Sequence, residues 1–400
     1  MTSIEAMTSS LDVVDELKIG IFSPLRLDFG GGFERFCINF AQYLRGQGHG
    51  VIIVTLDWLA RNDSRMSVMS LIENLARDQV TYRILPTMGA LQLAMASPLP
   101  TRGPIPIRKV LRDCDVVYFN NAYALQDFLC LAATRLSRSP PVVSAHHSVL
   151  HQNKVLHDTW VKLAVNTFWR NFQAFHALNA HDEAFLRNKT KRRVYTLPIP
   201  LNSKLYSPIE KKVSGDVCNV LFLGRLDIQK GVDILVEALR ILRLDETPYL
   251  LRMTFAGDGP LREQVGILAE ESDWVRYTIP SDEEKISLLR EADLLIMPSR
   301  SESFGIVAGE AMLSGLPVVA TMNPGCTELI RDGKTGFLIR ELTPVGVAAI
   351  LERCVSLWRT SPEVLRDVSI RARDAAHEYL DSKKLFPKYM RMLCDVAEAA

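Results

Sequence analysis

The sequence predicts an α/β protein with two Rossmann-like domains, at residues 18–198 and 214–378. Three observations predict this fold class. Short apolar strands alternate with amphipathic helices in both halves of the chain. A glycine-rich turn at 30–32 follows the first strand and opens a strand–turn–helix–strand unit. The same order of elements starts again near residue 217, so we expect two similar domains rather than one large one.

Composition excludes several classes of protein. The net charge of +1 argues against nucleic acid as the main partner, because that partner requires a concentrated basic surface. The seven cysteines contain no Cys-x-x-Cys pair, so we expect neither a disulfide framework nor a zinc site. This cysteine usage is typical of a protein in a reducing compartment. Residues 1–17 are acidic and lack an apolar core, which predicts a disordered tail rather than a signal peptide. Because no run of 18 apolar residues occurs, no transmembrane helix is expected.

The first domain opens with a buried strand at 18–23, the glycine turn, and a helix at about 33–45. The glycine turn by itself is weak evidence for a ligand site, because it does not have the Gly-x-Gly-x-x-Gly pattern. Residues 57–112 are harder to interpret, apart from a predicted strand at 81–85. Two readings stay open for this region: a long surface excursion, or a lip that faces an acceptor or a membrane.

The strand predicted at 142–147 ends in two histidines. Alternation along a strand sends His146 and His147 to opposite faces. Ligands in parallel sheets bind beyond the carboxyl ends of the strands, so this position favours a functional histidine. The amphipathic helix predicted at 154–172 packs into the core, although its basic flank leaves a peripheral membrane contact open.

A paired aspartate motif, Asp113-Cys114-Asp115, matches the Asp-x-Asp pattern of metal-dependent transferases. It precedes a predicted strand rather than ending one, so we interpret it as a turn that holds no metal. The segment 199–213, with its prolines and terminal lysines, predicts the linker between the domains. In the second domain, Arg225 and Lys230 follow the first strand, where two cations can neutralise a diphosphate.

The stretch 293–315 combines a short buried strand, a polar loop, and a helix that begins at Phe304 or Gly305. The free amides at the start of such a helix favour an anion. Glu302 and Glu310 lie on either side of this turn. Carboxylates repel phosphate but can bind vicinal hydroxyls, so the pattern predicts a ligand that carries both phosphates and sugar hydroxyls.

With its two glutamates, the stretch ESFGIVAGEAMLSGLPVVAT resembles the acidic motif of the retaining glycosyltransferases of family 4. The run GRLDIQKG, which holds Arg225 and Lys230, is similar to another motif of that family. The resemblance implies the GT-B architecture, in which the two domains face an interdomain cleft and the last helix, here 379–400, crosses back to the first domain. It also implies transfer of a sugar from a nucleoside-diphosphate donor to an acceptor hydroxyl, with retention at the anomeric carbon.

The resemblance also implies roles for individual residues. Arg225 and Lys230 would stabilise the leaving diphosphate, and Glu310 would hold the ribose. His147, selected by its register after Pro141, would contact the donor sugar from the other domain, and Gly31 and Gly32 would face the donor. The donor sugar would be held by Glu302 and by the backbone amides of Phe304, Gly305, Ile306 and Val307. Two family features differ here: the linker reads Ile-Pro-Leu-Asn rather than Pro-Asn-Gly, and Ile279-Pro280 replaces a glycine.

We therefore expect an enzyme that needs neither a metal nor a cofactor besides its nucleotide-sugar substrate. Its expected partners are that donor and a glycan, lipid-linked or small-molecule acceptor, with no nucleic acid. We expect a cytoplasmic protein and leave open an association with the cytoplasmic face of the membrane. Two alternatives remain at this point: a nucleotide-sugar epimerase or hydrolase on the same architecture, and a non-catalytic protein that binds sugar nucleotides.

Overall fold

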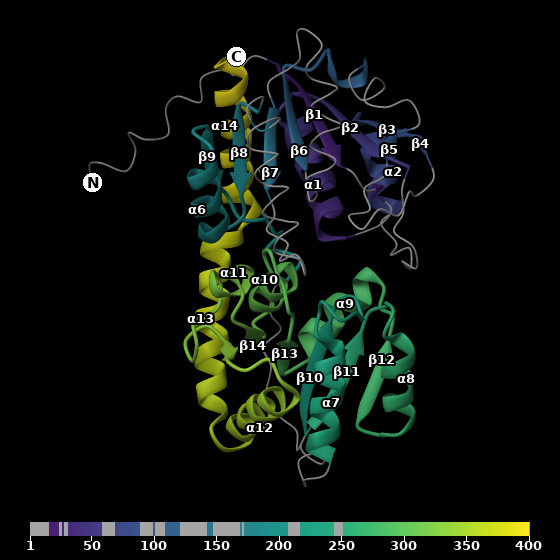
Figure 1. Cartoon of the computed structure of the whole chain (residues 1–400), viewed down its shortest axis with the longest axis vertical. Helices are drawn as coiled ribbons and strands as arrows, with labels where there is room; N and C mark the ends of the chain where they lie inside the picture. The colour runs from purple at the N-terminus through teal and green to yellow at the C-terminus, as the bar shows by residue number, and fades with distance from the viewer. Residues whose placement is uncertain are drawn as a thin grey trace, which may run out of the picture.

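The computed structural model places two α/β units one above the other along the long axis of the molecule (Figure 1). The structure describes residues 16–23, 26–27, 31–57, 69–88, 99–100, 109–120, 142–146, 169, 172–206, 217–243 and 251–399. Most of the predicted tail, most of the predicted helix at 154–172 and part of the linker lie outside these residues.

The first unit, here called the N-terminal domain, contains a sheet whose neighbouring strands are all parallel. In spatial order its strands are β3 (Thr81–Leu85), β2 (Gly50–Leu56), β1 (Lys18–Ser23), β6 (Val116–Asn120), β7 (Val142–His146), β8 (Ala174–Ala177) and β9 (Arg193–Thr196). The helices described here are α1 (Gly32–Gly46), α2 (Met69–Arg77) and α6 (Ala180–Lys189), and the short strands β4 (Thr87–Met88) and β5 (Leu99–Pro100) pair with each other. The strand predicted at 81–85 is confirmed as β3.

The second unit, the C-terminal domain, repeats this plan with a second parallel sheet. Its strands, in spatial order, are β12 (Val275–Thr278), β11 (Leu251–Ala256), β10 (Cys218–Leu223), β13 (Leu294–Met297), β14 (Val318–Thr321) and β15 (Phe337–Ile339). Its helices are α7 (Val232–Arg243), α8 (Arg262–Glu270), α9 (Asp282–Glu291), α10 (Ile306–Leu313), α11 (Pro324–Thr327), α12 (Pro344–Thr360) and α13 (Pro362–Leu380). Four-residue strands such as LLIM are buried along their whole length, as expected for sheets covered on both faces.

Both sheets reverse their strand order at one point. In the N-terminal domain the reversal lies between β1 and β6, and in the C-terminal domain it lies between β10 and β13. Ligands of doubly wound sheets bind at such points, beyond the carboxyl ends of the strands. The segment that leads into α1 and the loop that leads into α10 follow strands at these two points. The topology therefore indicates a ligand site at these loops.

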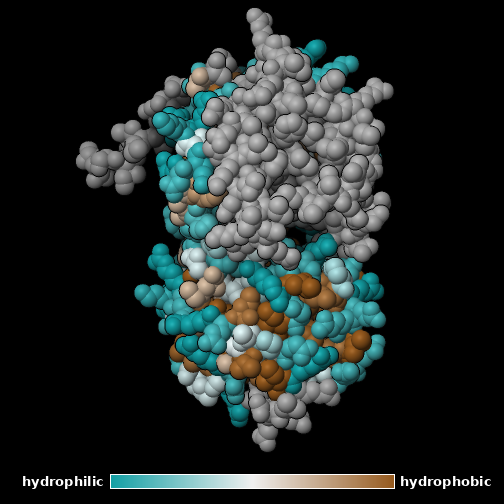
Figure 2. Space-filling model, in the orientation of Figure 1, coloured by the Kyte–Doolittle hydropathy of each residue, from teal (hydrophilic) through white to brown (hydrophobic). Residues whose placement is uncertain are grey.

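The two domains touch at these loops. A Cβ atom placed on Gly32, at the start of α1, would lie 2.3 Å from the Cδ1 atom of Ile306, at the start of α10. The absence of a side chain at Gly32 thus allows the N-termini of two helices from different domains to approach each other. On the face of the C-terminal domain seen in Figure 2, apolar residues are interspersed with hydrophilic ones, as is usual for protein surfaces.

The last helix, α14 (Ser382–Glu398), leaves the C-terminal domain and packs against α1, β6 and β7 of the N-terminal domain (Figure 1). Its Tyr389 hydroxyl lies 3.2 Å from Nε2 of the buried His176, whose Nδ1 lies 2.9 Å from the Tyr118 hydroxyl. Burial lowers the pKa of His176 to about 4, so the ring is neutral at neutral pH. No helix among the described residues is long and apolar enough to cross a membrane.

The two chain segments that connect the domains are hydrogen-bonded to each other. The Leu201 amide donates to the Leu380 carbonyl at 2.8 Å, and the Ser382 amide donates to the Leu201 carbonyl at 2.9 Å. Leu201 belongs to the outgoing connection after β9, whereas Leu380 and Ser382 belong to the returning connection between α13 and α14. The outgoing and the returning crossings therefore lie side by side.

Candidate functional site

The loop between β13 and α10 forms the centre of the candidate site. Gly305 is the N-cap of α10 and has φ of 73°, a left-handed conformation that a residue with a side chain adopts only with strain. Helix α10 begins at Ile306, after the predicted start at Phe304 or Gly305, because Gly305 is not helical. Phe304 is 2% exposed and fixes the loop to the core. The first amides of α10 have no acceptors within the helix, so this turn has the donors needed for an anion.

Glu302, just before this turn, is paired with a lysine from another loop. Its Oε2 atom lies 2.6 Å from Nζ of Lys230, and the two side chains are 13% and 29% exposed. Burial by itself lowers the pKa of Lys230, but the adjacent Glu302 carboxylate more than offsets this and holds the pKa above its ordinary value. The sequence predicts that both residues belong to one site, and the structure brings them into direct contact.

Asp227 organises the loop that carries both predicted cations. Its Oδ1 atom accepts a hydrogen bond from the Lys230 amide at 2.8 Å, and its Oδ2 atom lies 3.0 Å from Nε of Arg225. Gly231, with φ of 71°, brings this loop against the end of β13, since a Cβ there would lie 2.0 Å from the Pro298 carbonyl oxygen. Sequence reasoning missed Asp227, although its place between the two cations in GRLDIQKG is a usable signal.

Glu310, in α10, is 3% exposed and receives two donors on the same oxygen. Tyr206 donates its hydroxyl to Glu310 Oε1 at 2.8 Å, and Lys285 Nζ lies 2.6 Å from the same atom. The second oxygen, Oε2, is buried and has no hydrogen-bond partner among the described residues. Tyr206 and Lys285 lie far from Glu310 in sequence, so spacing along the chain gave no signal for either residue.

The N-terminal domain contacts the site loop directly. Asn179, the N-cap of α6, donates from Nδ2 to the Ser303 carbonyl at 2.8 Å, and the Ala180 amide donates to Glu328 Oε1 at 2.9 Å. On a second line of contact, Arg35 of α1 forms a two-pronged ion pair with Asp282 of α9, at 2.9 and 2.7 Å. These bonds join the two domains at the site loop and between α1 and α9.

The glycine turn before α1 is described from Gly31 onward. Gly31 is the N-cap of α1, and Glu34 is its third helical residue, the position from which a glutamate reaches back to the N-cap amide. Burial raises the pKa of Glu34 to about 7, opposed by hydrogen bonds from backbone amides that include that of Gly31. Gly31, predicted to face a ligand, thus lies at the N-cap of α1, and Gly32 lies at the contact between the domains.

Several predicted residues lie away from this cluster. His147 is outside the described residues, and His146 is the last residue of β7, so the structure does not test either of them. The Asp113–Asp115 motif precedes β6, and Asp115 Oδ2 accepts the Lys18 amide at 2.7 Å, which gives this aspartate a structural role at the far end of the sheet. Among the described residues, no group of three or more histidines, cysteines and acids is placed to hold a metal ion.

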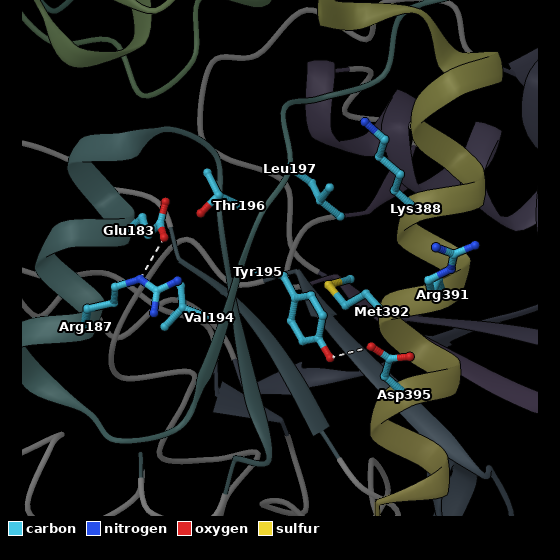
Figure 3. Close-up of a pocket in the computed structure, with 10 residues that line it drawn as sticks. All are labelled: Glu183, Arg187, Val194, Tyr195, Thr196, Leu197, Lys388, Arg391, Met392 and Asp395. Carbon is cyan, nitrogen blue, oxygen red and sulfur yellow. Dashed lines mark hydrogen bonds and ion pairs between the residues drawn. The ribbon is translucent and has the colours of Figure 1, made fainter.

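A cavity of about 360 Å³ lies elsewhere, between α6, β9 and α14 (Figure 3). Its acidic side chains are already paired: Glu183 with Arg187 at 2.7 Å, and Asp395 with the Tyr195 hydroxyl at 3.1 Å. None of the residues that line this cavity belongs to the cluster around Glu302 and Glu310. We therefore assign the candidate site to the cluster at the domain interface rather than to this cavity.

Two family descriptions match this chain, one on each domain. Residues 30–202 match "Glycosyltransferase Family 4", and residues 218–357 match "Glycosyl transferases group 1". A 41.2 kDa protein from the cps region of Klebsiella pneumoniae is 33% identical over 181 residues, which cover 44% of this chain and 49% of that protein. A D-inositol 3-phosphate glycosyltransferase of Streptomyces scabiei is 37% identical over 147 residues, which cover 33% of this chain and 32% of the relative. The matched stretches thus span about a third to a half of these relatives.

Solved structures agree over a longer stretch. Anabaena HepE, solved with UDP and glucose, has a TM-score of 0.73 at 20% identity and covers 94% of this chain and 99% of its own. A glycosyltransferase of Rickettsia africae gives the same TM-score at 17% identity, over 96% of this chain and 100% of its own. At these identities the likeness concerns the fold, which is GT-B. Together with the two family matches, which include the loop of Arg225 and the turn of Glu302, it shows that the chain belongs to the group 1, family 4 glycosyltransferases.

Proposed function

We propose that this protein transfers a sugar from a nucleoside-diphosphate sugar to an acceptor hydroxyl, with retention at the anomeric carbon and without a metal ion. One observation carries the proposal: each glutamate beside the N-terminus of α10 is paired with a lysine at 2.6 Å. The pairing removes the repulsion that two bare carboxylates would exert on a diphosphate. The same turn can then accept phosphate on its amides and its cations, and sugar hydroxyls on its carboxylates.

The leaving diphosphate is assigned to Arg225, Lys230 and the first amides of α10. When the bond between the anomeric carbon and the diphosphate breaks, its electron pair passes to a phosphate oxygen, and preorganised positive charge stabilises that oxygen. Arg225 and Lys230 follow β10, and the α10 amides follow β13, the two strands at the order reversal of the sheet. These groups therefore converge where a doubly wound sheet binds its ligand.

The donor sugar and ribose are assigned to the two glutamates. Glu302 and the amides of Phe304, Gly305, Ile306 and Val307 lie at the turn and would hold the sugar, while Glu310, one helical turn further along, would hold the ribose. His147 would approach the reacting carbon from the N-terminal domain. Gly32 supports this arrangement because it already allows the two domains to meet at Ile306.

A donor screen followed by product analysis tests the proposal. Solved proteins of this fold hold UDP and UDP-glucose, so uridine donors are the first probes and guanosine donors the second. We expect one of these nucleoside diphosphates to raise the unfolding temperature, since a ligand that binds the native state stabilises it. With an acceptor present, nuclear magnetic resonance of the product should show the anomeric configuration of the donor. Consumption of donor without transfer would instead support a hydrolase or epimerase, and an absence of turnover would support a binding protein.

A further inference from the structure

We infer that Tyr206 and Lys285 are positioning residues that fix the free oxygen of Glu310 toward the ribose of the donor. The inference rests on the proposed function, because it assigns Glu310 to the ribose. It extends that function to two residues outside the two motifs that the sequence analysis singled out. Tyr206 lies in the connection between the domains, and Lys285 lies in the first half of α9.

The two carboxylate oxygens of Glu310 differ in the number of hydrogen bonds that they accept. Oε1 receives both the Tyr206 hydroxyl at 2.8 Å and the Lys285 ammonium at 2.6 Å, whereas Oε2 receives no donor among the described residues. A buried carboxylate oxygen without a donor is costly, so such an atom in a native protein calls for an explanation. A ligand hydroxyl that donates to Oε2 would satisfy it. Two bonds from different directions to Oε1 also restrict rotation of the carboxylate, so Oε2 is held in one direction.

The charge of the cluster indicates what kind of group binds there. Lys285 already neutralises Glu310, and the two side chains are 15% and 4% exposed. A cationic ligand group would therefore gain little at Oε2, while a neutral hydroxyl can donate a charge-assisted hydrogen bond without leaving an unpaired charge behind. Such hydroxyls are what ribose offers. The 2′ and 3′ hydroxyls are thus the two groups to test.

A purely structural role for the cluster is the alternative. Tyr206 and Lys285 would then only join the connection, α9 and α10 to one another, and their loss would weaken the fold without changing which nucleoside binds. The two roles differ in one measurable quantity. Only a positioning role makes the preference for ribose over deoxyribose depend on the Tyr206 hydroxyl and the Lys285 ammonium.

The experiment measures that preference by titration calorimetry with UDP, 2′-deoxy-UDP and 3′-deoxy-UDP, and with the matching guanosine series. The tighter-binding series is the one scored. Wild-type protein should bind the ribonucleotide about 10-fold or more tightly than one of its deoxy forms, the effect of one charge-assisted hydrogen bond. Glu310→Ala should abolish that ratio. Tyr206→Phe and Lys285→Met should each reduce it several-fold, while the affinity for inorganic pyrophosphate, which probes the phosphate subsite alone, stays unchanged.

Two matched variants serve as controls. Tyr195→Phe removes another tyrosine hydroxyl bonded to a carboxylate, Asp395, and Lys384→Met removes another lysine paired with a glutamate, Glu378. Both should keep the wild-type ratio. If Glu310→Ala abolishes the preference but Tyr206→Phe and Lys285→Met retain it, the inference is wrong and the ribose assignment stands. If Glu310→Ala retains the preference, or if neither nucleotide series binds, the proposed function itself is overturned along with the inference.

Discussion

Nζ of Lys230 and Oε2 of Glu302 lie 2.6 Å apart, although 72 residues separate them in the chain. A lysine assigned to a leaving diphosphate is thus held by a carboxylate assigned to the sugar of the same donor. The pair keeps the ammonium at the turn before α10 and keeps it charged, since the contact with Glu302 holds its pKa above the ordinary value despite burial. Lys230 can then face a phosphate oxygen without reorientation from solvent, which is the arrangement that favours stabilisation of a leaving group.

Replacing Lys230 should therefore damage turnover strongly. We expect Lys230→Ala to lower kcat by ~100-fold or more, as the loss of an oxyanion donor does. Lys230→Arg should recover part of that loss, because it keeps the positive charge. Steady-state kinetics with saturating donor measure both effects, and Lys384→Ala is the control for removing a lysine that is paired elsewhere. A kcat of Lys230→Ala within about threefold of wild type would be too small a loss for a leaving-group role.

Transfer should persist in a chelator. The proposed charge stabilisation comes from Arg225, Lys230 and the α10 amides, so a divalent ion is not required. We would measure sugar transfer in excess EDTA with the donor saturating, beside a sample with added magnesium or manganese. Complete loss in EDTA, restored by either metal, would assign the leaving group to a metal ion instead of to these cations.

Gly32 should tolerate only a very small side chain. A Cβ there would lie 2.3 Å from Ile306 Cδ1, the movable end of its side chain, so Gly32→Ala should cost little while Gly32→Val should separate the N-termini of α1 and α10. We expect Gly32→Val to lower kcat/KM by roughly 10-fold or more, since misplacement by about 1 Å can reduce rate 100-fold. Ile306→Ala in the same chain should recover part of this loss. Gly46→Val, where a Cβ would meet nothing within 4 Å, is the matched control.

His147 should affect turnover more than nucleotide binding. We assign it to the donor sugar, on the side of the N-terminal domain. The groups assigned to the diphosphate, Arg225 and Lys230, belong to the C-terminal domain, so His147 acts only when the two domains are together. We expect His147→Ala to lower kcat by roughly 100-fold, within the range for the loss of a catalytic group, and to leave the nucleoside-diphosphate affinity near wild type. Calorimetry and kinetics on His146→Ala provide the comparison. Damage from His146→Ala together with a silent His147→Ala would shift the assignment by one residue.

Acid should destabilise the fold through His176. Its pKa is about 4 in the folded protein, below the ordinary value of 6.5, so between these pH values the unfolded chain binds a proton that the folded protein does not. The free energy of unfolding should be independent of this group above about pH 6.5 and should fall by about 3 kcal/mol as the pH drops to about 4. Urea unfolding at several pH values measures this fall. His176→Gln should reduce the pH dependence over that interval, and an unchanged slope would assign it to other groups.

Sequence reasoning recovers most of the framework of the C-terminal domain. Strands there are short apolar runs bounded by polar residues, as in LLIM before the loop of Glu302, and buried parallel strands need this pattern. Two short runs of sequence single out Glu302, Glu310, Arg225 and Lys230 as candidates. Their exact partners are not found, since Lys230–Glu302 and Lys285–Glu310 are created by packing of separate elements.

Contacts between the domains are the part that pattern reasoning misses altogether. Arg35 and Asp282 are separated by 247 residues, and neither lies in a motif that the sequence analysis singles out. Tyr206 lies in a segment that reads as a linker, and nothing in its neighbours indicates a buried hydroxyl. The partners of such residues depend on how the two folded domains pack against each other, and local periodicity in the sequence does not encode that packing.

The hydrogen bonds that join Leu201 to Leu380 and Ser382 have a consequence for any motion of this protein. Two separate connections would allow the halves to twist and slide as well as to open. Two connecting segments that are hydrogen-bonded to each other restrict twisting and sliding of the domains. The expected motion is therefore a rotation about one pivot beside Leu201. Because the returning segment continues into α14, which packs on the N-terminal domain, removal of the last helix would leave the outgoing segment as the one covalent connection that bridges the two domains. We thus expect the returning segment at Leu380 and Ser382 to form one hinge together with Leu201, which lies about 180 residues earlier in the chain.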